Sequence, residues 1–114
     1  MSAISTHVLD TARGAPAAGM TVTLEHRDPQ GQWHLIGHGK TGQDGRLASL
    51  MSESAMLVPG EYRLTFQTGN YFQAVGAVGF YPTVTVTFEA AAGQTHYHVP
   101  LLLSPFGYST YRGA

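Results

Sequence analysis

The stretch at residues 20–27, MTVTLEHR, alternates apolar and polar side chains along most of its length. Because successive side chains of a β-strand point to opposite faces, Val22 and Leu24 share one face, while threonines and a glutamate occupy the other. The stretch at residues 84–90, VTVTFEA, repeats the same period of two. These two runs predict strands with one buried face, and they favour an all-β fold.

Other short β-rich runs lie around these two stretches and are separated by turn signals. Fourteen glycines and six prolines punctuate the chain, as in the turns expected at residues 28–31 (DPQG) and 43–45 (QDG). Five further strands are expected at residues 5–11, 33–41, 61–67, 95–103 and 106–113. Residues 47–57 are ambiguous and add a possible short strand. The spacing therefore predicts a sandwich of seven or eight strands, antiparallel in most pairings.

One short helix is expected in addition to the strands. Residues 68–70, Thr-Gly-Asn, are suited to cap a helix over about residues 71–78. The chain has 114 residues, near the usual size of one compact domain, and it shows no internal repeat or linker. We expect a single domain covering residues 1–114.

Charged side chains make up only 11% of the residues, and the formal net charge is −1. A phosphate-binding surface needs clustered cations, so we expect no nucleic-acid partner. No stretch approaches the roughly 20 apolar residues of a membrane helix, so we expect no membrane association. The absence of cysteine excludes disulfides, thiolate catalysis and Cys-based zinc sites. A weakly charged surface also favours self-association.

The first residues do not resemble a targeting segment. Residues 1–6 lack both a basic start and an apolar run. We therefore expect a cytoplasmic protein, or a periplasmic one if the sequence is a mature form whose signal has been removed.

Six histidines against a single lysine are the main groups that can titrate near neutral pH. His96 and His98 lie two apart in an expected strand and therefore share a face. Such a pair is half of a zinc site, which needs one or two further ligands; the alternative is two histidines on a solvated strand face. His7 in mid-strand is typical of a hydrogen-bonded structural residue, and Arg46 after a turn is typical of a solvated charge. The other histidines, His26, His34 and His38, are expected at the surface or at a sheet edge.

The sequence lacks the motifs of several catalytic classes. It contains no G-x-S-x-G elbow, P-loop, G-x-G-x-x-G fingerprint or H-E-x-x-H motif. If the protein is an enzyme, we expect histidine and arginine side chains to act on a bound small molecule. Those side chains activate water without a covalent intermediate.

Two parts of the chain resemble the transthyretin-like family. The first is STHVLD at residues 5–10, continued by ARGAPA at residues 12–17, and the second is LLSPFGYSTYRGA at residues 102–114. The segments GEY at residues 60–62 and FYP at residues 80–82 are also similar to the family. The resemblance thus spans nearly the whole chain and implies a transthyretin-like (prealbumin-like) sandwich.

The enzymatic branch of this family carries four separated motifs that this chain matches in order. They are a histidine before Val-Leu-Asp, an arginine after an Asp-Gly turn, a His-x-His before Pro-Leu-Leu, and a closing Tyr-Arg-Gly-Ser. The resemblance implies that His7, Arg46 and His98 are catalytic, while His96 is not carried over. The implied substrate-binding residues are His7, Arg46, Tyr111, Arg112, Gly113 and Ala114. Position 114 departs from the pattern, because alanine replaces the usual serine and its hydroxyl is missing.

The resemblance also implies an activity and an assembly. The implied reaction is hydrolysis of 5-hydroxyisourate, a purine-derived small molecule of urate breakdown, to 2-oxo-4-hydroxy-4-carboxy-5-ureidoimidazoline. A cyclic amidase of this kind opens a lactam C–N bond with water and needs no metal and no cofactor. The implied assembly is a homotetramer, a dimer of dimers whose central channel holds sites made by facing subunits.

Two alternatives stay open at this point. One is a transthyretin-like carrier that binds a small apolar or aromatic ligand without catalysis. The other is a histidine-based metalloprotein built on His96 and His98. Substrate turnover separates the first from the hydrolase, and metal analysis separates the second.

Overall fold

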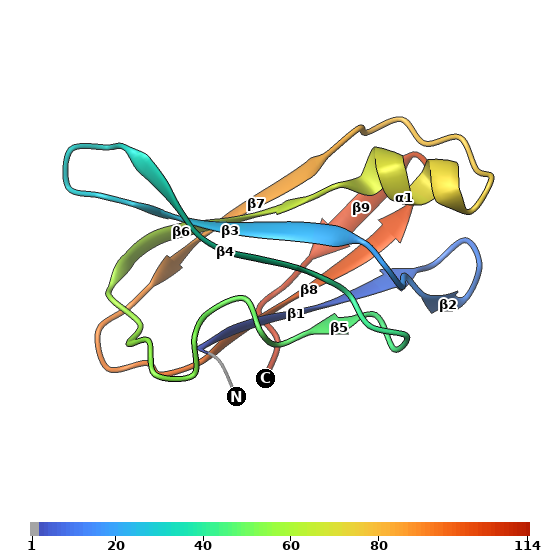
Figure 1. Cartoon of the computed structure of the whole chain (residues 1–114). Coiled ribbons are helices and arrows are strands. Elements are labelled where there is room, and N and C mark those ends of the chain that lie inside the picture. Colours follow the sequence, from blue (N-terminus) through green and yellow to red (C-terminus); the bar gives the residue numbers. More distant parts are fainter. Residues whose placement is uncertain (1–2) are drawn as a thin grey trace.

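The alternating runs form two β-sheets in the computed structural model, which describes residues 3–114 (Figure 1). Residues 1 and 2 of the expected domain lie outside the described residues. Within the described part, the chain forms nine strands and one helix: β1 (Ile4–Asp10), β2 (Ala15–Pro16), β3 (Thr21–Arg27), β4 (Trp33–Lys40), β5 (Arg46–Leu47), β6 (Gly60–Phe66), α1 (Thr68–Ala74), β7 (Val84–Ala90), β8 (Tyr97–Ser104) and β9 (Gly107–Thr110).

The first sheet has the order β2-β1-β8-β9, with β5 also paired to β1, and the second has the order β4-β3-β6-β7. β1 and β8 are parallel, whereas the other pairs in residues 3–114 are antiparallel. The prediction of a mostly antiparallel sandwich with one short helix is confirmed. Two of the nine strands in this described range, β2 and β5, have only two residues each, which leaves seven longer ones.

The core lies between the two sheets and follows the alternation of the sequence. Val22 and Leu24 of β3 are fully buried, as their shared face predicted. Val8 of β1 and Leu101 of β8 are fully buried from the opposite sheet. Because side chains alternate along a strand, the neighbours of these residues on β1 and β8 point away from the core.

The helix begins and ends earlier than expected, at Thr68 and Ala74. The Thr68 hydroxyl does not cap the helix, because it donates to the carbonyl of Tyr81 at 2.7 Å instead. At the other end, Gly76 adopts a φ of 75°, and the N–H of Ala77 donates to the carbonyl of Phe72. This is a glycine-terminated helix end, in which a left-handed residue stops the helix and satisfies its last carbonyls.

Three expected strands also differ in extent. β8 begins at Tyr97, so His96 lies just outside the strand, and β9 ends at Thr110, so residues 111–114 lie beyond it. Among residues 48–59 the structure has no strand. Instead, both backbone polar groups of Val58 bind the Tyr62 hydroxyl, at 3.1 Å through the N–H and 2.6 Å through the carbonyl. Side-chain hydrogen bonding thus replaces strand pairing there.

A buried polar cluster joins α1 to the end of β1. Asp10 is 2% exposed; its carboxylate accepts from the Tyr71 hydroxyl at 2.7 Å and from the Arg13 backbone N–H at 3.1 Å. The Arg13 guanidinium donates to the same hydroxyl at 3.0 Å. Tyr71 therefore connects a buried acid to a cation. Burial, followed by the bond to Asp10, raises the pKa of Tyr71 above its ordinary value.

We predict that Tyr71→Phe lowers the free energy of unfolding by about 2 kcal/mol, because it leaves a buried carboxylate oxygen without its donor. Urea unfolding at one fixed protein concentration, followed by fluorescence of Trp33, measures this directly. Tyr108→Phe is the matched control, since that tyrosine is 42% exposed, and it should change stability by less than about 0.5 kcal/mol. Equal effects of the two variants would contradict the role given to the cluster.

Candidate active site

A cavity of about 210 Å³ opens where β1, β5 and β8 meet. It is lined by Ser5, Thr6, Arg46, Leu47, Ala48, His96, His98 and Ala114. Two of the residues expected to be catalytic, Arg46 and His98, therefore face one hollow. The third, His7, is the direct cross-strand partner of Arg46.

Strand register places these side chains on one face of the sheet. Ile4 and Val8 of β1 are fully buried in the core, so Ser5 and His7 point to the outer face. Ser5 pairs with His98 across the parallel β1–β8 ladder. The ladders on the two sides of β1 thus bring β5 and β8 residues together around it.

Arg46 is held at the cavity by a tight turn. Gly45 has a φ of 79°, and a Cβ there would come within 2.4 Å of the Val8 carbonyl oxygen, so only glycine fits. Asp44 accepts the Arg46 backbone N–H at 2.9 Å, but its carboxylate is 3.9 Å from the guanidinium Nε. The Arg46 side chain is 65% exposed. Its charge is therefore only weakly paired and available to a bound molecule.

The tautomer of His7 follows from its hydrogen bond. Nε2 of His7 lies 2.8 Å from the backbone carbonyl oxygen of Asp44. A carbonyl only accepts, so Nε2 carries the proton and Nδ1 is the nitrogen left with a lone pair when the ring is neutral. His7 is thereby fixed by the turn that also positions Arg46.

His98 is half-buried, and Nδ1 of its ring lies 2.9 Å from the Ser5 hydroxyl oxygen. Burial lowers the pKa of His98 below its ordinary value of 6.5, and the charges of His7, His96 and Arg46 lower it further. The imidazole is consequently neutral at neutral pH. A neutral ring is the form that accepts a proton from water.

Ser5 is a site residue that sequence reasoning missed. It is 7% exposed and lies within hydrogen-bonding distance of both His96 and His98. The available signal was the alternation of β1, which puts residues 5 and 7 on one face. The contact itself depends on a partner more than 90 positions away, and local pattern does not reveal it.

The four residues after β9 divide into two pairs. Gly113 donates its N–H to the carbonyl of His98 at 2.8 Å, and a Cβ at Gly113 would come within 2.7 Å of the His98 ring. Ala114 lines the cavity. The side chains of Tyr111 and Arg112 instead border a different cavity, between β7 and β9, where Arg112 lies over the Tyr97 ring. Within one chain, then, only Gly113 and Ala114 of this segment reach His98.

The residues that the structure describes contain no group of three or more His, Cys, Asp or Glu side chains placed to hold a metal ion. His96 and His98 approach the same hydroxyl, and within residues 3–114 neither a carboxylate nor a further histidine completes a ligand set with them. In residues 3–114 there is also no helix with the length and apolarity to cross a membrane.

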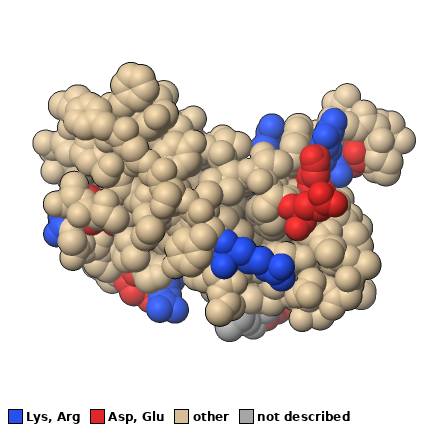
Figure 2. All heavy atoms as spheres, turned by 180° about the vertical axis from the view of Figure 1, so that it is seen from behind, with Lys and Arg blue, Asp and Glu red and all other residues tan. Residues whose placement is uncertain are grey.

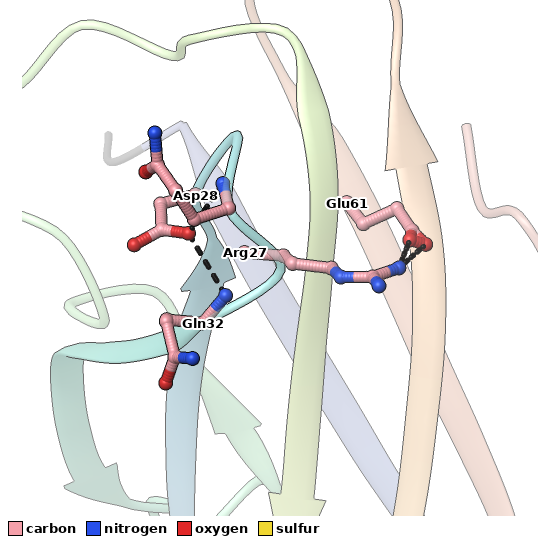
Figure 3. A network of polar contacts seen from close by, with 5 residues as sticks. Arg27, Asp28, Gln32 and Glu61 are labelled. Atoms are coloured by element: carbon pink, nitrogen blue, oxygen red, sulfur yellow. Dashed lines mark hydrogen bonds and ion pairs between the residues drawn. The ribbon is translucent and has the colours of Figure 1, made fainter.

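A larger cavity, of about 450 Å³, lies at the β3–β4 turn. Figure 3 shows that its charged side chains are already paired: Arg27 reaches Glu61 at 3.0 Å, and Asp28 accepts the Gln32 backbone N–H at 2.8 Å. His26 also lines it, with Nε2 buried and given no hydrogen-bond partner by the described residues. Of the two positions expected for His26, the sheet edge is wrong, because β3 is an interior strand; the side chain is half-buried beside this cavity.

Comparison with known proteins gives a consistent result along the whole chain. The model of the HIUase/Transthyretin family matches residues 4–113. A 5-hydroxyisourate hydrolase of Salmonella dublin is 46% identical over 111 residues, which cover 97% of this chain and 80% of that protein.

Two solved structures are similar in fold and in sequence. The 5-hydroxyisourate hydrolase of Klebsiella pneumoniae has a TM-score of 0.83 at 36% identity, over 100% of this chain and 94% of that one. Sea bream transthyretin in complex with thyroxine has a TM-score of 0.90 at 31% identity, over 98% and 95% of the two chains.

We predict that Arg46→Gln raises the pKa of His98, because it removes one of the positive charges that disfavour the imidazolium. NMR titration of the His98 ring should give a midpoint below 6.5 in the parent protein and a higher one in the variant. Arg27→Gln is the matched control, since Arg27 is not among the groups that shift His98. A midpoint that stays fixed or falls in Arg46→Gln would place the guanidinium away from the ring.

Proposed function

The chain belongs to the HIUase/transthyretin family, and on that premise we propose that the cavity between β1, β5 and β8 is the active site of a 5-hydroxyisourate hydrolase. The chain is a hydrolase of urate degradation, because it shares this family with relatives at 43–46% identity that are named 5-hydroxyisourate hydrolase. The observation that carries the choice of site is that the half-buried His98 and the weakly paired Arg46 line the same cavity.

His98 is the proposed general base. The groups that lower its pKa keep it neutral at working pH, and its ring lines the cavity, whereas His7 lies beside Arg46 outside that lining. In the proposed step, His98 takes one proton from water while the water oxygen attacks the lactam carbonyl carbon. The imidazolium then returns that proton to the ring nitrogen as the C–N bond breaks. The products are an opened ring and a carboxylic acid, which releases its proton to solvent and becomes a carboxylate. No covalent enzyme intermediate forms.

Arg46 is the proposed partner of the charge that develops on the carbonyl oxygen. A guanidinium stays protonated at any relevant pH and presents several N–H donors in one plane. Its weak pairing with Asp44 leaves those donors available to the tetrahedral intermediate. Preorganised donors aimed at a developing oxyanion are commonly the largest electrostatic contribution to such reactions. His7, held beside Arg46, completes the proposed catalytic set.

We also propose that the chain acts as a homotetramer, a dimer of dimers. β7 and β9 are both edge strands, and one cavity is lined by residues 86–89 of β7 and by Thr110 of β9. The two open edges therefore lie on the same side of the sandwich. Unpaired backbone groups at an edge are a template for another strand, and a second copy offers the same two edges.

A second feature that supports association is an exposed apolar patch at the β8–β9 turn. Phe80 and Phe106 are 68% and 73% exposed, and the backbone N–H of Phe80 binds the Pro105 carbonyl. Figure 2 shows charged side chains in only a few separate groups on a mostly uncharged face. In a tetramer, a facing subunit would cover the open cavity. It would also allow Tyr111 and Arg112, which lie away from His98 within one chain, to take part in binding.

We predict that His98→Asn lowers kcat/KM for 5-hydroxyisourate by about 10² to 10⁴, the usual contribution of a general base. Asparagine keeps a polar atom near Ser5 but lacks the outer ring nitrogen, so the loss reports the base itself. Freshly generated substrate is followed by its ultraviolet decay against the spontaneous rate. His38→Asn, an exposed histidine on β4, is the control and should keep full activity. More than half of the parent activity in His98→Asn would exclude this residue as the base.

We predict that Phe106→Glu dissociates the assembly, because it places a charge in an apolar contact. Light scattering and activity are measured together over a dilution series, and specific activity should fall with the tetramer fraction. Met56→Glu, at a side chain 85% exposed in the 48–59 loop, is the control and should remain tetrameric. A fully active monomer would overturn the shared site and leave each chain with a cleft of its own.

A further inference from the structure

The Ser5 hydroxyl lies between two imidazoles. Its oxygen is 2.9 Å from Nδ1 of His98 and 3.4 Å from Nε2 of His96. Ser5 is 7% exposed, so little bulk water competes for these contacts. Its place is fixed by the β1–β8 ladder, in which Ser5 pairs directly with His98. The next residue, Thr6, adds a 2.6 Å bond from its hydroxyl to the Val99 carbonyl.

The direction of these two bonds decides what His98 can do. A hydroxyl has one proton and two lone pairs, so it can donate to only one of the two rings. If Ser5 donates to His98, the proton of the neutral ring sits on Nε2, and that atom cannot accept one from water. If Ser5 donates to His96, its oxygen accepts from Nδ1–H of His98, and Nε2 of His98 keeps its lone pair. The tautomer of a histidine is thus set by the bond that its other nitrogen makes.

We propose that Ser5 and His96 are positioning residues that hold His98 in the tautomer with a lone pair on Nε2. Nε2 of His96 accepts the Ser5 proton, and Ser5 in turn accepts the Nδ1–H of His98. This inference rests on the proposed function, in which His98 is the base, and it gives a role to the histidine that motif resemblance leaves out. The arrangement is analogous to the acid of a catalytic triad, which orients its histidine without taking the proton.

The proton relay from water to the leaving nitrogen needs no protein group besides His98, and the new carboxylic acid loses its own proton to solvent. Nε2 of His98 takes the water proton, and the resulting imidazolium is stabilised because Nδ1–H already donates to the Ser5 oxygen. The Ser5 proton stays on the hydroxyl, shared with His96. When the C–N bond breaks, His98 returns the proton from Nε2 to the leaving nitrogen. Ser5 and His96 end the cycle in the protonation state in which they began it.

The direct test is the ¹⁵N chemical shifts of the His98 ring, measured without substrate at a pH above its titration. We expect the parent protein to show a protonated Nδ1 and an unprotonated Nε2. In Ser5→Ala and in His96→Phe, we expect the ring to lose this preference. A parent ring protonated on Nε2 would overturn the proposal, whether or not the protein hydrolyses 5-hydroxyisourate. The tautomer therefore tests this inference separately from the activity.

Turnover gives the second test. Ser5→Ala should lower kcat by roughly tenfold to a hundredfold, the usual cost of a mispositioned catalytic group, with KM changed less than twofold. Ser5→Thr keeps the hydroxyl and should restore most of the rate. Ser52→Ala, an exposed serine of the 48–59 loop, is the matched control. Fluorescence of Trp33 confirms that each variant is folded. Two results would contradict the proposed role. One is that Ser5→Thr loses as much kcat as Ser5→Ala, and the other is that Ser5→Ala keeps full activity.

Discussion

The parallel pairing of β1 with β8 is the contact on which both the sandwich and the site depend. Its seven residue pairs run from Ile4 opposite Tyr97 to Asp10 opposite Leu103. One face of this ladder supplies fully buried core residues, and the other places Ser5 beside His98. Because strand side chains alternate, a slip of one residue would exchange the two faces. The register that buries the core is therefore the register that assembles the site.

The cavity gathers groups of like charge around His98, the histidine that we propose as the base. Burial and the neighbouring His7, His96 and Arg46 all disfavour a proton on His98. The Asp44 carboxylate only weakly offsets the charge of Arg46, because it stands 3.9 Å from the guanidinium Nε. In the proposed reaction, the positive surroundings that keep His98 neutral also stabilise the negative charge that develops on the carbonyl oxygen.

Local pattern predicted the strands well, because alternation and turn residues act over a few positions. The strand at residues 84–90 has the expected bounds, and Val22 has the expected burial. The helix was misplaced because Thr68 bonds to a residue 13 positions away instead of to its own helix end. Ser5 was missed for the same physical reason, since its partners come from the other end of the ladder. Motif resemblance named His98, but it did not reveal that Tyr111 points to a different cavity within one chain.

Ser5 and His98 are 93 positions apart in the chain, and this separation has a consequence for how the protein is made. Pairings so far apart in sequence form slowly, because the entropy of closing a long loop is lost before any contact is gained. During synthesis, the edge of β1 that pairs with β8 stays unpaired while six further strands, β2 to β7, are made. In that interval the unpaired edge can form non-native strand pairs. A nascent chain therefore gains its catalytic competence in one late step, and truncated chains that end before β8 carry only half of the site.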